Sequence, residues 1–208
     1  SAASDVYKRQ ARREEIIDAC AALYVTESYQ DITMTQIASR VSFGRANVYN
    51  YFQSKEEILL ALLQREHELW AQGLIELGRS TSLTSNGEIA DALGVSFGKR
   101  EQMLKLLAMN LYDMEQNSRS ENLVEFKQVY AQVVEVLHHL LEVKKPEWVN
   151  DRIDRFMYCF LSFLHGVYPY VFHSEKQLEA MKTAGIHQPD MTIYSLVRTC
   201  ATKLLQDD

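Results

Sequence analysis

One short stretch of the chain holds the side chains best suited to hydrogen bonding with a nucleic acid. The guanidinium of Arg45 matches the two acceptors of guanine, and the carboxamide of Asn47 matches the acceptor–donor pair of adenine or a phosphate. Thr33, Thr35 and Lys55 offer hydroxyl and ammonium groups that hold phosphate oxygens without reading sequence. This combination predicts a surface that binds the phosphates of a duplex and recognises some of its bases.

Two short helices are expected to position these side chains. Thr33 and Gln36 are expected to form a capping box. The Thr33 hydroxyl would accept from the backbone amide of Gln36, and the Gln36 side chain would accept from the backbone amide of Thr33. A break at 42–44 separates this helix from a second one over 45–52, and a second capping box at 54–57 opens a long helix. Such a layout is typical of a helix-turn-helix that enters the major groove.

The rest of the chain is also predicted to be helical. Its 208 residues include only three prolines and eight glycines, and apolar residues recur every three or four positions rather than every two. We therefore predict an all-α fold, with a three-helix DNA-binding domain over 1–53, a helical domain over 54–208 and a linking helix over 54–78. Further helices are expected at about 7–27, 88–98, 100–116, 120–144, 147–172, 174–184 and 189–206.

The net charge of −6 is divided unevenly along the chain. The first 55 residues hold seven basic and six acidic side chains and so carry +1, while the remaining 15 basic and 22 acidic side chains give −7. An acidic body with a near-neutral, locally basic head suits a protein that contacts phosphate at one end only. The charge permits DNA binding without being diagnostic of it.

Several other classes of protein lack support in the sequence. No run reaches the roughly 20 apolar residues that a bilayer-spanning helix needs, and no basic segment followed by an apolar run opens the chain. The three cysteines are widely spaced and odd in number, which argues against a disulfide framework and fits a reducing compartment. We expect a cytoplasmic protein without membrane partners.

No catalytic, metal or cofactor site is predicted. The sequence has no Ser-His-Asp order, no glycine-rich phosphate loop and no isolated carboxylate pair in apolar surroundings. None of the six histidines pairs at i, i+4 beside a carboxylate, as a helical metal site requires. His165, which lies among apolar neighbours, is expected to be a hydrogen-bonding core or pocket residue.

Two segments carry a family resemblance. ITMTQIA over 32–38 and VYNYFQSKEE over 48–57 resemble the TetR family of transcriptional regulators, and the resemblance covers about residues 9–62. The family commonly has glycine where Ser28 and Ser42 stand and serine where Gly44 stands. Because glycine tolerates a left-handed turn and can also serve as an N-cap, these departures are expected to be tolerated at some cost.

The resemblance implies roles for residues around the second short helix. Tyr49 and Tyr51 would contact the DNA backbone or thymine methyl groups, and Phe52 would anchor the helix in the core. Arg12 and Arg13 are candidates for minor-groove or phosphate contacts, with a solvated surface position as the alternative. The predicted DNA-binding set is Thr33, Thr35, Arg45, Ala46, Asn47, Tyr49, Asn50, Tyr51 and Lys55.

A homodimer is expected from both the pattern and the resemblance. Residues 156–165 are apolar on every face of a helix, so they need neighbours on all sides, which indicates a partner subunit. In the TetR family the last two long helices form a four-helix interface, here 147–172 and 189–206, and two heads read a palindrome. The expected interface residues are Phe156, Met157, Leu161, Leu164, Ile193, Leu196, Val197, Cys200 and Leu204.

The resemblance also implies a ligand pocket in the C-terminal domain. Aromatic and methionine stripes at helical spacing suit an apolar pocket with a few polar groups, and they equally suit an ordinary core. The candidate pocket residues are Met103, Leu107, Leu111, Tyr112, Phe126, Tyr130, Phe160, Phe163 and His165.

These inferences together describe a homodimeric repressor that a small apolar or amphipathic effector releases from a palindromic operator. The effector would favour a spacing of the two heads that no longer matches successive major grooves, roughly 34–36 Å apart. The alternative is a dimeric adaptor with the same fold that binds protein, against which Arg45, Tyr49, Tyr51 and Lys55 argue. A helical enzyme would need a catalytic cluster that the sequence lacks.

Overall fold

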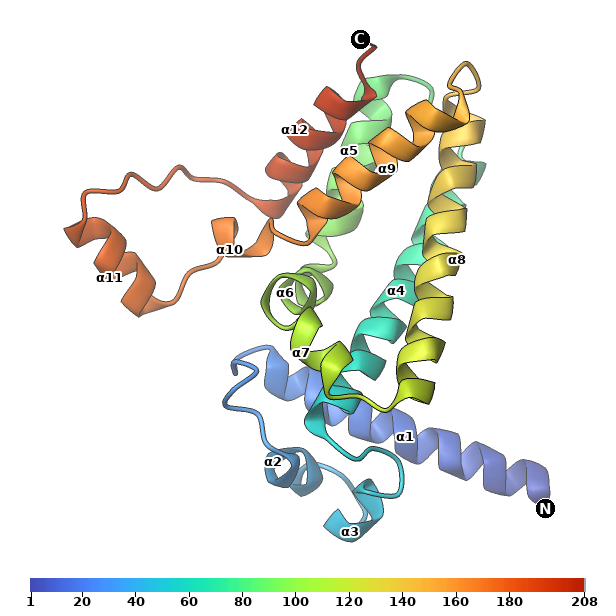
Figure 1. Cartoon of the computed structure of the whole chain (residues 1–208), viewed down its shortest axis with the longest axis vertical. Coiled ribbons are helices and arrows are strands. Elements are labelled where there is room, and N and C mark those ends of the chain that lie inside the picture. Colours follow the sequence, from blue (N-terminus) through green and yellow to red (C-terminus); the bar gives the residue numbers. More distant parts are fainter. Residues whose placement is uncertain (208) are drawn as a thin grey trace. The chain divides into compact units, whose positions relative to one another are not determined.

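The computed structural model describes residues 1–207, apart from the side chain of Met109. The described residues form twelve helices and no strand, which confirms the all-α prediction (Figure 1). They group into two compact units. We call Ser1–His67 with Met109–Tyr130 the head, and Glu68–Ala108 with the chain from Ala131 onward the body.

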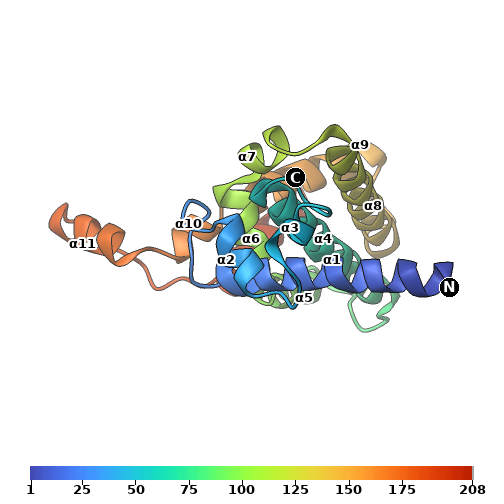
Figure 2. The same cartoon turned by 90° about the horizontal axis from the view of Figure 1, so that it is seen from below.

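The head is built around the C-terminal half of its first helix. Ile16, Ile17 and Cys20 form a buried stripe at helical spacing, as the amphipathic pattern predicts, and Ile37 and Val48 from the two short helices are also buried. The helices of the head are α1 (Ala2–Tyr24), α2 (Met34–Ser39), α3 (Arg45–Val48), the first turns of α4 (Lys55–Arg79), α7 (Leu111–Gln116) and the first turns of α8 (Ser120–Lys144) (Figure 2).

The body is centred on a chain of aromatic side chains. Trp70, Phe97, Phe160 and Phe156 follow one another with ring centroids 4.8, 5.8 and 5.5 Å apart. Its helices are the rest of α4 and α8, α5 (Asn86–Gly98), α6 (Glu101–Met109), α9 (Asn150–Leu164), α10 (Tyr168–Val171), α11 (Glu175–Thr183) and α12 (Ile193–Leu205).

Two local features hold α12 in the body. A Cβ at Gly94 of α5 would lie 3.0 Å from the backbone oxygen of Tyr194, so only glycine permits this close approach of the two helices. Arg152, on α9, donates to the carbonyls of Leu204 and Gln206 at 2.6 and 2.9 Å, which caps the last turn of α12 with a cation.

The compact units do not follow the predicted division after residue 53. The chain passes between head and body within α4 after His67, before Met109, and within α8 after Tyr130. The segment 109–130 therefore belongs with the head, although it lies more than 50 residues beyond the helix-turn-helix in the sequence. Local helix signals cannot reveal such a long-range association.

Two predicted helices are interrupted. The helix expected over 100–116 breaks at Asn110, whose φ of −145° and ψ of 11° are not helical. The helix expected over 147–172 begins at Asn150 and ends at Leu164; a loop that includes Gly166 follows, and then the short α10, with a proline in its first turn. Among residues 1–207, no helix has the length and apolar character needed to cross a bilayer.

Candidate functional site

The first turn of α3 presents its side chains to solvent while its far side is anchored. Arg45, Ala46 and Asn47 are exposed. Val48 and Phe52 are buried in the head, which confirms the predicted anchoring role of Phe52. The helix is shorter than predicted: it ends at Val48, and turn hydrogen bonds carry the chain on to Phe52.

The predicted capping box at the start of α2 is present. The Thr33 hydroxyl accepts from the amide of Gln36 at 3.2 Å, and the Gln36 side chain accepts from the amide of Thr33 at 2.9 Å. Because the hydroxyl oxygen acts as an acceptor, its own proton is still available to a phosphate oxygen. Thr35, in the first turn of α2, is exposed beside it.

The turn between α2 and α3 is stabilised by a carboxylate instead of by glycine. Both the amide and the hydroxyl of Ser42 donate to the Glu15 side chain of α1, the hydroxyl at 3.0 Å. No non-glycine residue in the described chain has a positive φ, and Gly44 has a φ of −64°. The departures from the family pattern at Ser42 and Gly44 therefore impose no left-handed strain.

Three arginines of α1 lie over aromatic rings beside the helix-turn-helix. The guanidinium carbons of Arg9, Arg12 and Arg13 lie 4.8, 5.5 and 5.3 Å from the ring centroids of Tyr51, Phe43 and Phe52, in that order. Arg9 and Arg12 are exposed, whereas Arg13 is partly buried. The sequence analysis missed Arg9; a helical wheel would have placed it near Arg12 and Arg13 but could not show its contact with Tyr51.

Tyr51 and Lys55, both predicted to contact DNA, are only partly exposed and contact other residues of the head. The Tyr51 ring is partly buried between Arg9 and Phe43, with its centroid 6.1 Å from that of Phe43. The Lys55 ammonium donates to the carbonyls of Tyr29 and Ile32 at 2.7 and 3.0 Å. Lys55 therefore ties α4 to the loop before α2, with one N–H left for another acceptor.

The second predicted capping box forms only in part, and its glutamate holds an ion pair that the sequence analysis did not predict. Ser54 accepts from the amide of Glu57 at 3.2 Å, but the Glu57 carboxylate accepts from the amide of Gln53 at 2.8 Å instead of from that of Ser54. The same buried carboxylate accepts from Arg119 at 2.8 Å from Nε, 2.9 Å from Nη2 and 2.9 Å from the backbone amide. This bidentate pair attaches the start of α8 to the start of α4.

The pKa of Glu57 reflects that environment. Burial alone would raise the pKa by penalising the charged form, but the hydrogen bonds from Arg119 and from the backbone amides outweigh it and lower the pKa from 4.5 to about 2. The carboxylate is therefore charged at neutral pH. It offered no sequence signal beyond its place in the capping box, because Arg119 is 62 residues away.

The predicted pocket residues do not gather in one unit. Leu111, Tyr112, Phe126 and Tyr130 belong to the head, whereas Met103, Leu107, Phe160, Phe163 and His165 belong to the body. Tyr112 is 75% exposed, because the break at Asn110 changes the helical phase on which the predicted stripe depended. Nδ1 of His165 lies 2.7 Å from the carbonyl oxygen of Leu161, so this histidine is hydrogen-bonded as expected.

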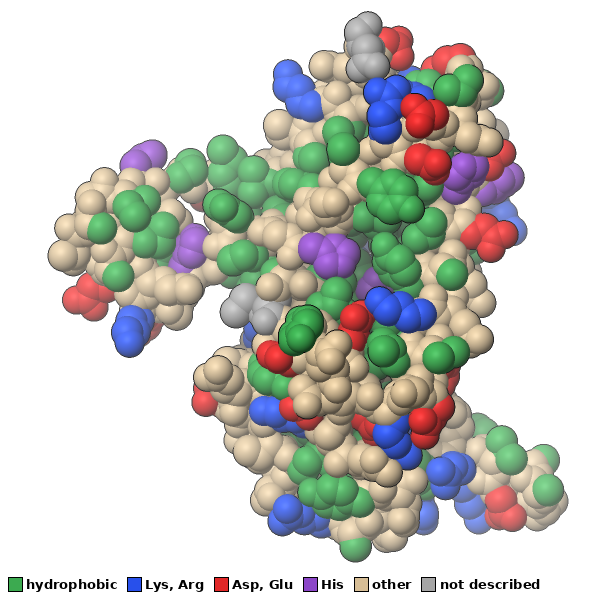
Figure 3. Space-filling view, in the orientation of Figure 1, with side chains coloured by type: hydrophobic (Ala, Val, Ile, Leu, Met, Phe, Trp, Pro, Cys, Tyr) green, Lys and Arg blue, Asp and Glu red, His purple; other side chains and the backbone are tan. Residues whose placement is uncertain are grey.

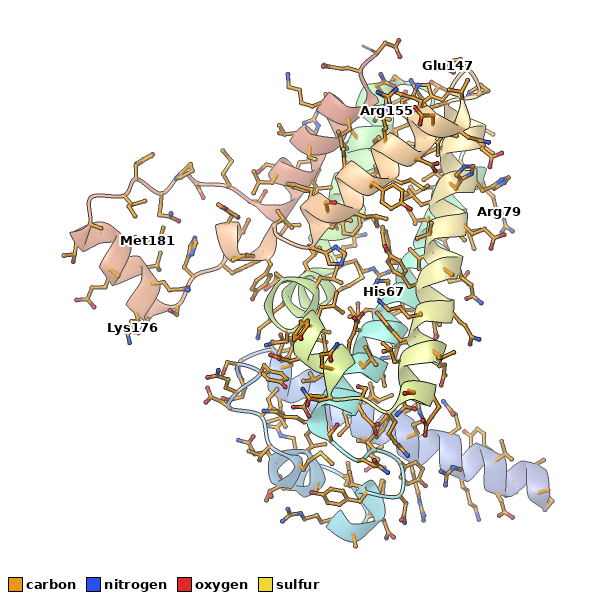
Figure 4. The ribbon with its side chains drawn as sticks, in the orientation of Figure 1. His67, Arg79, Glu147, Arg155, Lys176 and Met181 are labelled. Carbon is orange, nitrogen blue, oxygen red and sulfur yellow. The ribbon has the colours of Figure 1, made fainter. Side chains whose placement is uncertain are left out.

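Two apolar grooves lie in the body. The α9–α12 groove, about 430 Å³ in volume, is lined by Ser162, Phe163, Gly166, Val167, Tyr170, Gln188, Pro189, Met191 and Leu196. The α4–α8 groove, about 350 Å³, is lined by Leu74, Ile75, Gly78, Arg79, Glu135, Val136, His139, Leu140 and Val143; Figure 4 labels Arg79 among them. Of the predicted pocket residues, Phe163 lines the α9–α12 groove.

Most of the predicted dimer-interface residues pack inside the body. Phe156, Met157, Leu161, Leu164, Ile193 and Val197 are buried within the single chain, whereas Leu196, Cys200 and Leu204 are partly exposed. The prediction treated α9 as apolar on every face, but Tyr158 is 72% exposed and Cys159 and Ser162 are exposed. The core of one chain satisfies the apolar face of α9, so a partner would meet the opposite face.

Two family models together match most of the chain. Residues 16–62 match the model described as bacterial regulatory proteins, tetR family, and residues 64–206 match the tetracyclin repressor-like C-terminal domain. The head residues that carried the resemblance lie within the first match. Both models describe regulators of transcription and not enzymes, in agreement with the expectation from the sequence.

Individual proteins agree with the family models. The chain is 37% identical over 67 residues to the HTH-type transcriptional regulator SrpR of Pseudomonas putida, covering 32% of each protein. It is 31% identical over 74 residues to the HTH-type transcriptional activator FasR of Mycolicibacterium smegmatis, covering 36% of this chain and 34% of FasR. The matched part thus spans about a third of each of these relatives.

Solved structures show the same fold over nearly the whole chain. The fatty acid degradation regulator FadR from Bacillus halodurans superimposes with a TM-score of 0.62 at 17% identity, covering 93% of this chain and 94% of FadR. A TetR/AcrR-family regulator from Thermobifida fusca gives a TM-score of 0.60 at 20% identity, covering 94% and 97%. At such identities these structures support the fold alone. With both family models matched in order, the chain belongs to the TetR family of DNA-binding transcriptional regulators.

Proposed function

We propose that this regulator binds a palindromic operator as a homodimer and represses transcription until a small apolar or amphipathic effector releases it. The observation that carries the DNA side of the proposal is the first turn of α3, where Arg45 and Asn47 are exposed while Val48 and Phe52 are buried behind them. A recognition helix needs exposed side chains that reach the base edges and buried side chains that hold its backbone in place.

The head residues divide into two proposed kinds of contact. Arg45 and Asn47 would read bases, since their donor and acceptor geometry suits guanine and adenine. Thr33, Thr35 and Arg9 would hold phosphates, because they carry exposed donors around the same surface. Arg9 donates to the carbonyl of Asn50 at 3.5 Å and keeps further N–H donors for a phosphate. Ala46, Tyr49 and Asn50 are exposed on or just after α3 and would add contacts to the backbone or thymine methyl groups.

The homodimer would form through the outer faces of α9 and α12. Tyr158 and Cys159 are exposed on α9, and Leu196 and Cys200 are partly exposed on α12. Helices α9 and α12 pack against each other within the body, so these exposed side chains belong to adjoining faces. An isologous pairing of this surface would give two heads for the two half-sites of a palindrome.

The effector would bind in the α9–α12 groove. Its volume of about 430 Å³ lies within the usual range of small-molecule sites, and its lining is apolar, with Ser162, Gln188 and Tyr170 as hydrogen-bonding groups. This composition suits an apolar or amphipathic molecule with one polar end. Release from DNA would follow if the bound state favoured a different spacing of the two heads.

The DNA part of the proposal is tested by selecting binding sequences from a random duplex library with the full chain. The expected product is an inverted repeat that binds two chains per duplex, with an affinity that falls steeply as salt increases. Selection of no sequence, together with weak binding that ignores sequence, would favour the protein-binding adaptor.

The effector part is tested by screening amphipathic molecules for release of the labelled operator in fluorescence anisotropy. Tyr170→Ala, which changes an exposed residue of the α9–α12 groove, is expected to weaken the response to a hit about tenfold, the scale of one lost ligand contact. Val143→Ala, in the α4–α8 groove, is the matched control and should respond like the wild type. The reverse pattern would move the effector to the α4–α8 groove.

A further inference from the structure

Helix α11 is closed at both ends by its own sequence. Ser174 and Gln177 form a capping box at its start, with hydrogen bonds of 2.9 and 3.1 Å. At its end Gly185 adopts a φ of +73°, its amide donates to Lys182, and the amide of Ile186 donates to Met181 at 2.9 Å. This pair of bonds is a Schellman motif, for which a left-handed glycine is preferred.

The same helix has no residue buried in the described chain. In Figures 1 and 2 it stands away from the other helices of the body, within the segment that connects α10 to α12. An isolated helix of nine residues is marginal in water even with good caps, because most helical stability in proteins comes from packing an apolar face. A helix specified this strongly therefore needs a surface to pack on.

One face of α11 is suited to such packing. Leu178 and Met181 lie three residues apart on the same side of the helix, and the Schellman turn folds Ile186 back toward Met181. Leu178 is 46% exposed and Ile186 is 54% exposed. Lys176, which Figure 4 labels together with Met181, lies nearly opposite Leu178 by helical rotation. Glu175 and Lys182 lie one turn on either side of Leu178 and border the apolar face. Apolar side chains are also visible on this lobe in Figure 3.

We propose that α11 is an arm that packs, through Leu178, Met181 and Ile186, on a second copy of this chain. The inference rests on the homodimer of the proposed function. A face of three side chains is far too small to recruit a partner by itself, since stable interfaces bury on the order of 1,000 Å² or more. It can contribute when another contact already holds the partner nearby, because the local concentration is then very high.

The position of the arm identifies that partner. The segment that carries α11 follows the end of α9 and ends at Thr192, the N-cap of α12. These are the two helices whose outer faces form the proposed dimer surface, so a second copy docked there lies at the root of the arm. By two-fold symmetry each subunit would give one arm and receive one, which doubles the contribution of a small face.

The test compares two variants that change the net charge equally. Leu178→Glu combined with Met181→Glu places two carboxylates on the apolar face, and Lys176→Glu makes the same change of −2 on the opposite face. The dimer dissociation constant, measured by sedimentation of the full chain, should rise at least tenfold in the first variant and stay near the wild-type value in the second. Circular dichroism melting checks that both variants are folded.

A photo-cross-linking amino acid at each position gives an independent readout. At Met181 it should produce a covalent dimer on a denaturing gel, and at Lys176 it should leave the chain monomeric. Equal dissociation constants for both variants, or cross-links from position 181 that stay within one chain, would overturn the proposal that α11 packs on a second copy. If the wild type dimerises and binds its palindrome while this happens, the arm alone fails; a monomeric wild type overturns the homodimer as well.

Discussion

Arg45 is the residue that we propose as the main reader of a base. It is exposed in the first turn of α3, next to Asn47, whose side-chain oxygen accepts from the side-chain amide Nδ2 of Asn50 at 3.4 Å. That contact restrains Asn47 and leaves its amide hydrogens for a base. Lys55 is the opposite case, because its ammonium is engaged by two carbonyls of its own chain.

Replacing Arg45 by alanine is expected to cost about 1–3 kcal/mol of specific binding and to relax one operator position, because a bidentate contact to guanine is lost. Anisotropy titrations with the selected operator and with single-base variants measure both effects. Arg79→Ala, an exposed arginine of the body, is the control and should leave affinity and preference unchanged. Unchanged affinity in Arg45→Ala would remove Arg45 from the reading surface.

Restoring the glycine common in the family at position 42 is expected to destabilise this head. Ser42→Ala loses the hydroxyl bond to Glu15, at a cost of about 0.5–1 kcal/mol, and Ser42→Gly adds about the same again through greater freedom of the unfolded chain. Hydrogen exchange of head peptides measures the order wild type, alanine, glycine. A glycine variant as stable as the wild type would show that the Glu15 contact contributes nothing.

Among the elements, the start of α8 is joined to the start of α4 by several hydrogen bonds. Arg119 donates three hydrogen bonds to the buried Glu57 carboxylate, and Ser54 donates to the carbonyl of Asn117 at 3.2 Å. Any movement of residues 117–120 would therefore act directly on the first turn of α4, which follows the recognition helix. This connection is a candidate route for the effector signal within the head.

Glu57→Gln is expected to destabilise the head by about 2–3 kcal/mol at pH 7, because it removes the charge that Arg119 and two amides bind. Since the folded pKa is about 2 and the ordinary value 4.5, this stabilisation is complete above pH 4.5 and is lost as the pH falls toward 2. The stability difference between wild type and variant should shrink over that interval.

Hydrogen exchange of peptides covering 45–60 measures this effect in the head. Both tryptophans, Trp70 and Trp148, lie in the body, so their fluorescence reports on the other unit. Glu121→Gln is the matched control, because Glu121 lies 3.9 Å from Arg119 but is 70% exposed. A pH-independent difference between wild type and Glu57→Gln would show that the carboxylate is not the source of the stabilisation.

At the scale of the whole molecule, the charge asymmetry along the sequence does not coincide with the two compact units. The first 55 residues carry +1, but the head also includes 56–67 and 109–130, so it holds 10 basic and 13 acidic side chains and carries −3, the same as the body with 12 and 15. The arginines of α1 and α3 therefore make only one part of the head locally basic, and this part would favour contact with phosphate. The proposed dimer would then align two heads on one duplex.

In a Cys200→Ser background, which removes the neighbouring thiol that could bridge to Cys159 within one chain, a short bis-maleimide should join two chains through Cys159, because this thiol is exposed on the proposed dimer face of α9. Adding Cys159→Ser should abolish the covalent dimer on a denaturing gel, and adding Cys20→Ser should not, because Cys20 is buried in the head. A chain that sediments as a dimer but gives no cross-link through Cys159 would place the interface on another surface.

The sequence by itself determined the features that depend on residues close together in the chain. The capping box at Thr33 and the helix over 120–144 were predictable because caps and helical periodicity are signals spanning a few residues. The buried position of Phe52 was implied by the family resemblance. The family resemblance rested on the same local segments. For the same reason, the start of α3 at Arg45 could be located from the sequence alone.

Only the tertiary structure decided which distant residues meet. It paired Glu57 with Arg119, turned Lys55 toward the carbonyls of the preceding loop, and filled the body with the apolar face of α9 that the sequence pattern had assigned to a partner. Many partners are compatible with one helical pattern, and the choice among them depends on how all the buried faces pack together. Sequence periodicity identifies a face to be buried, whereas packing selects what buries it.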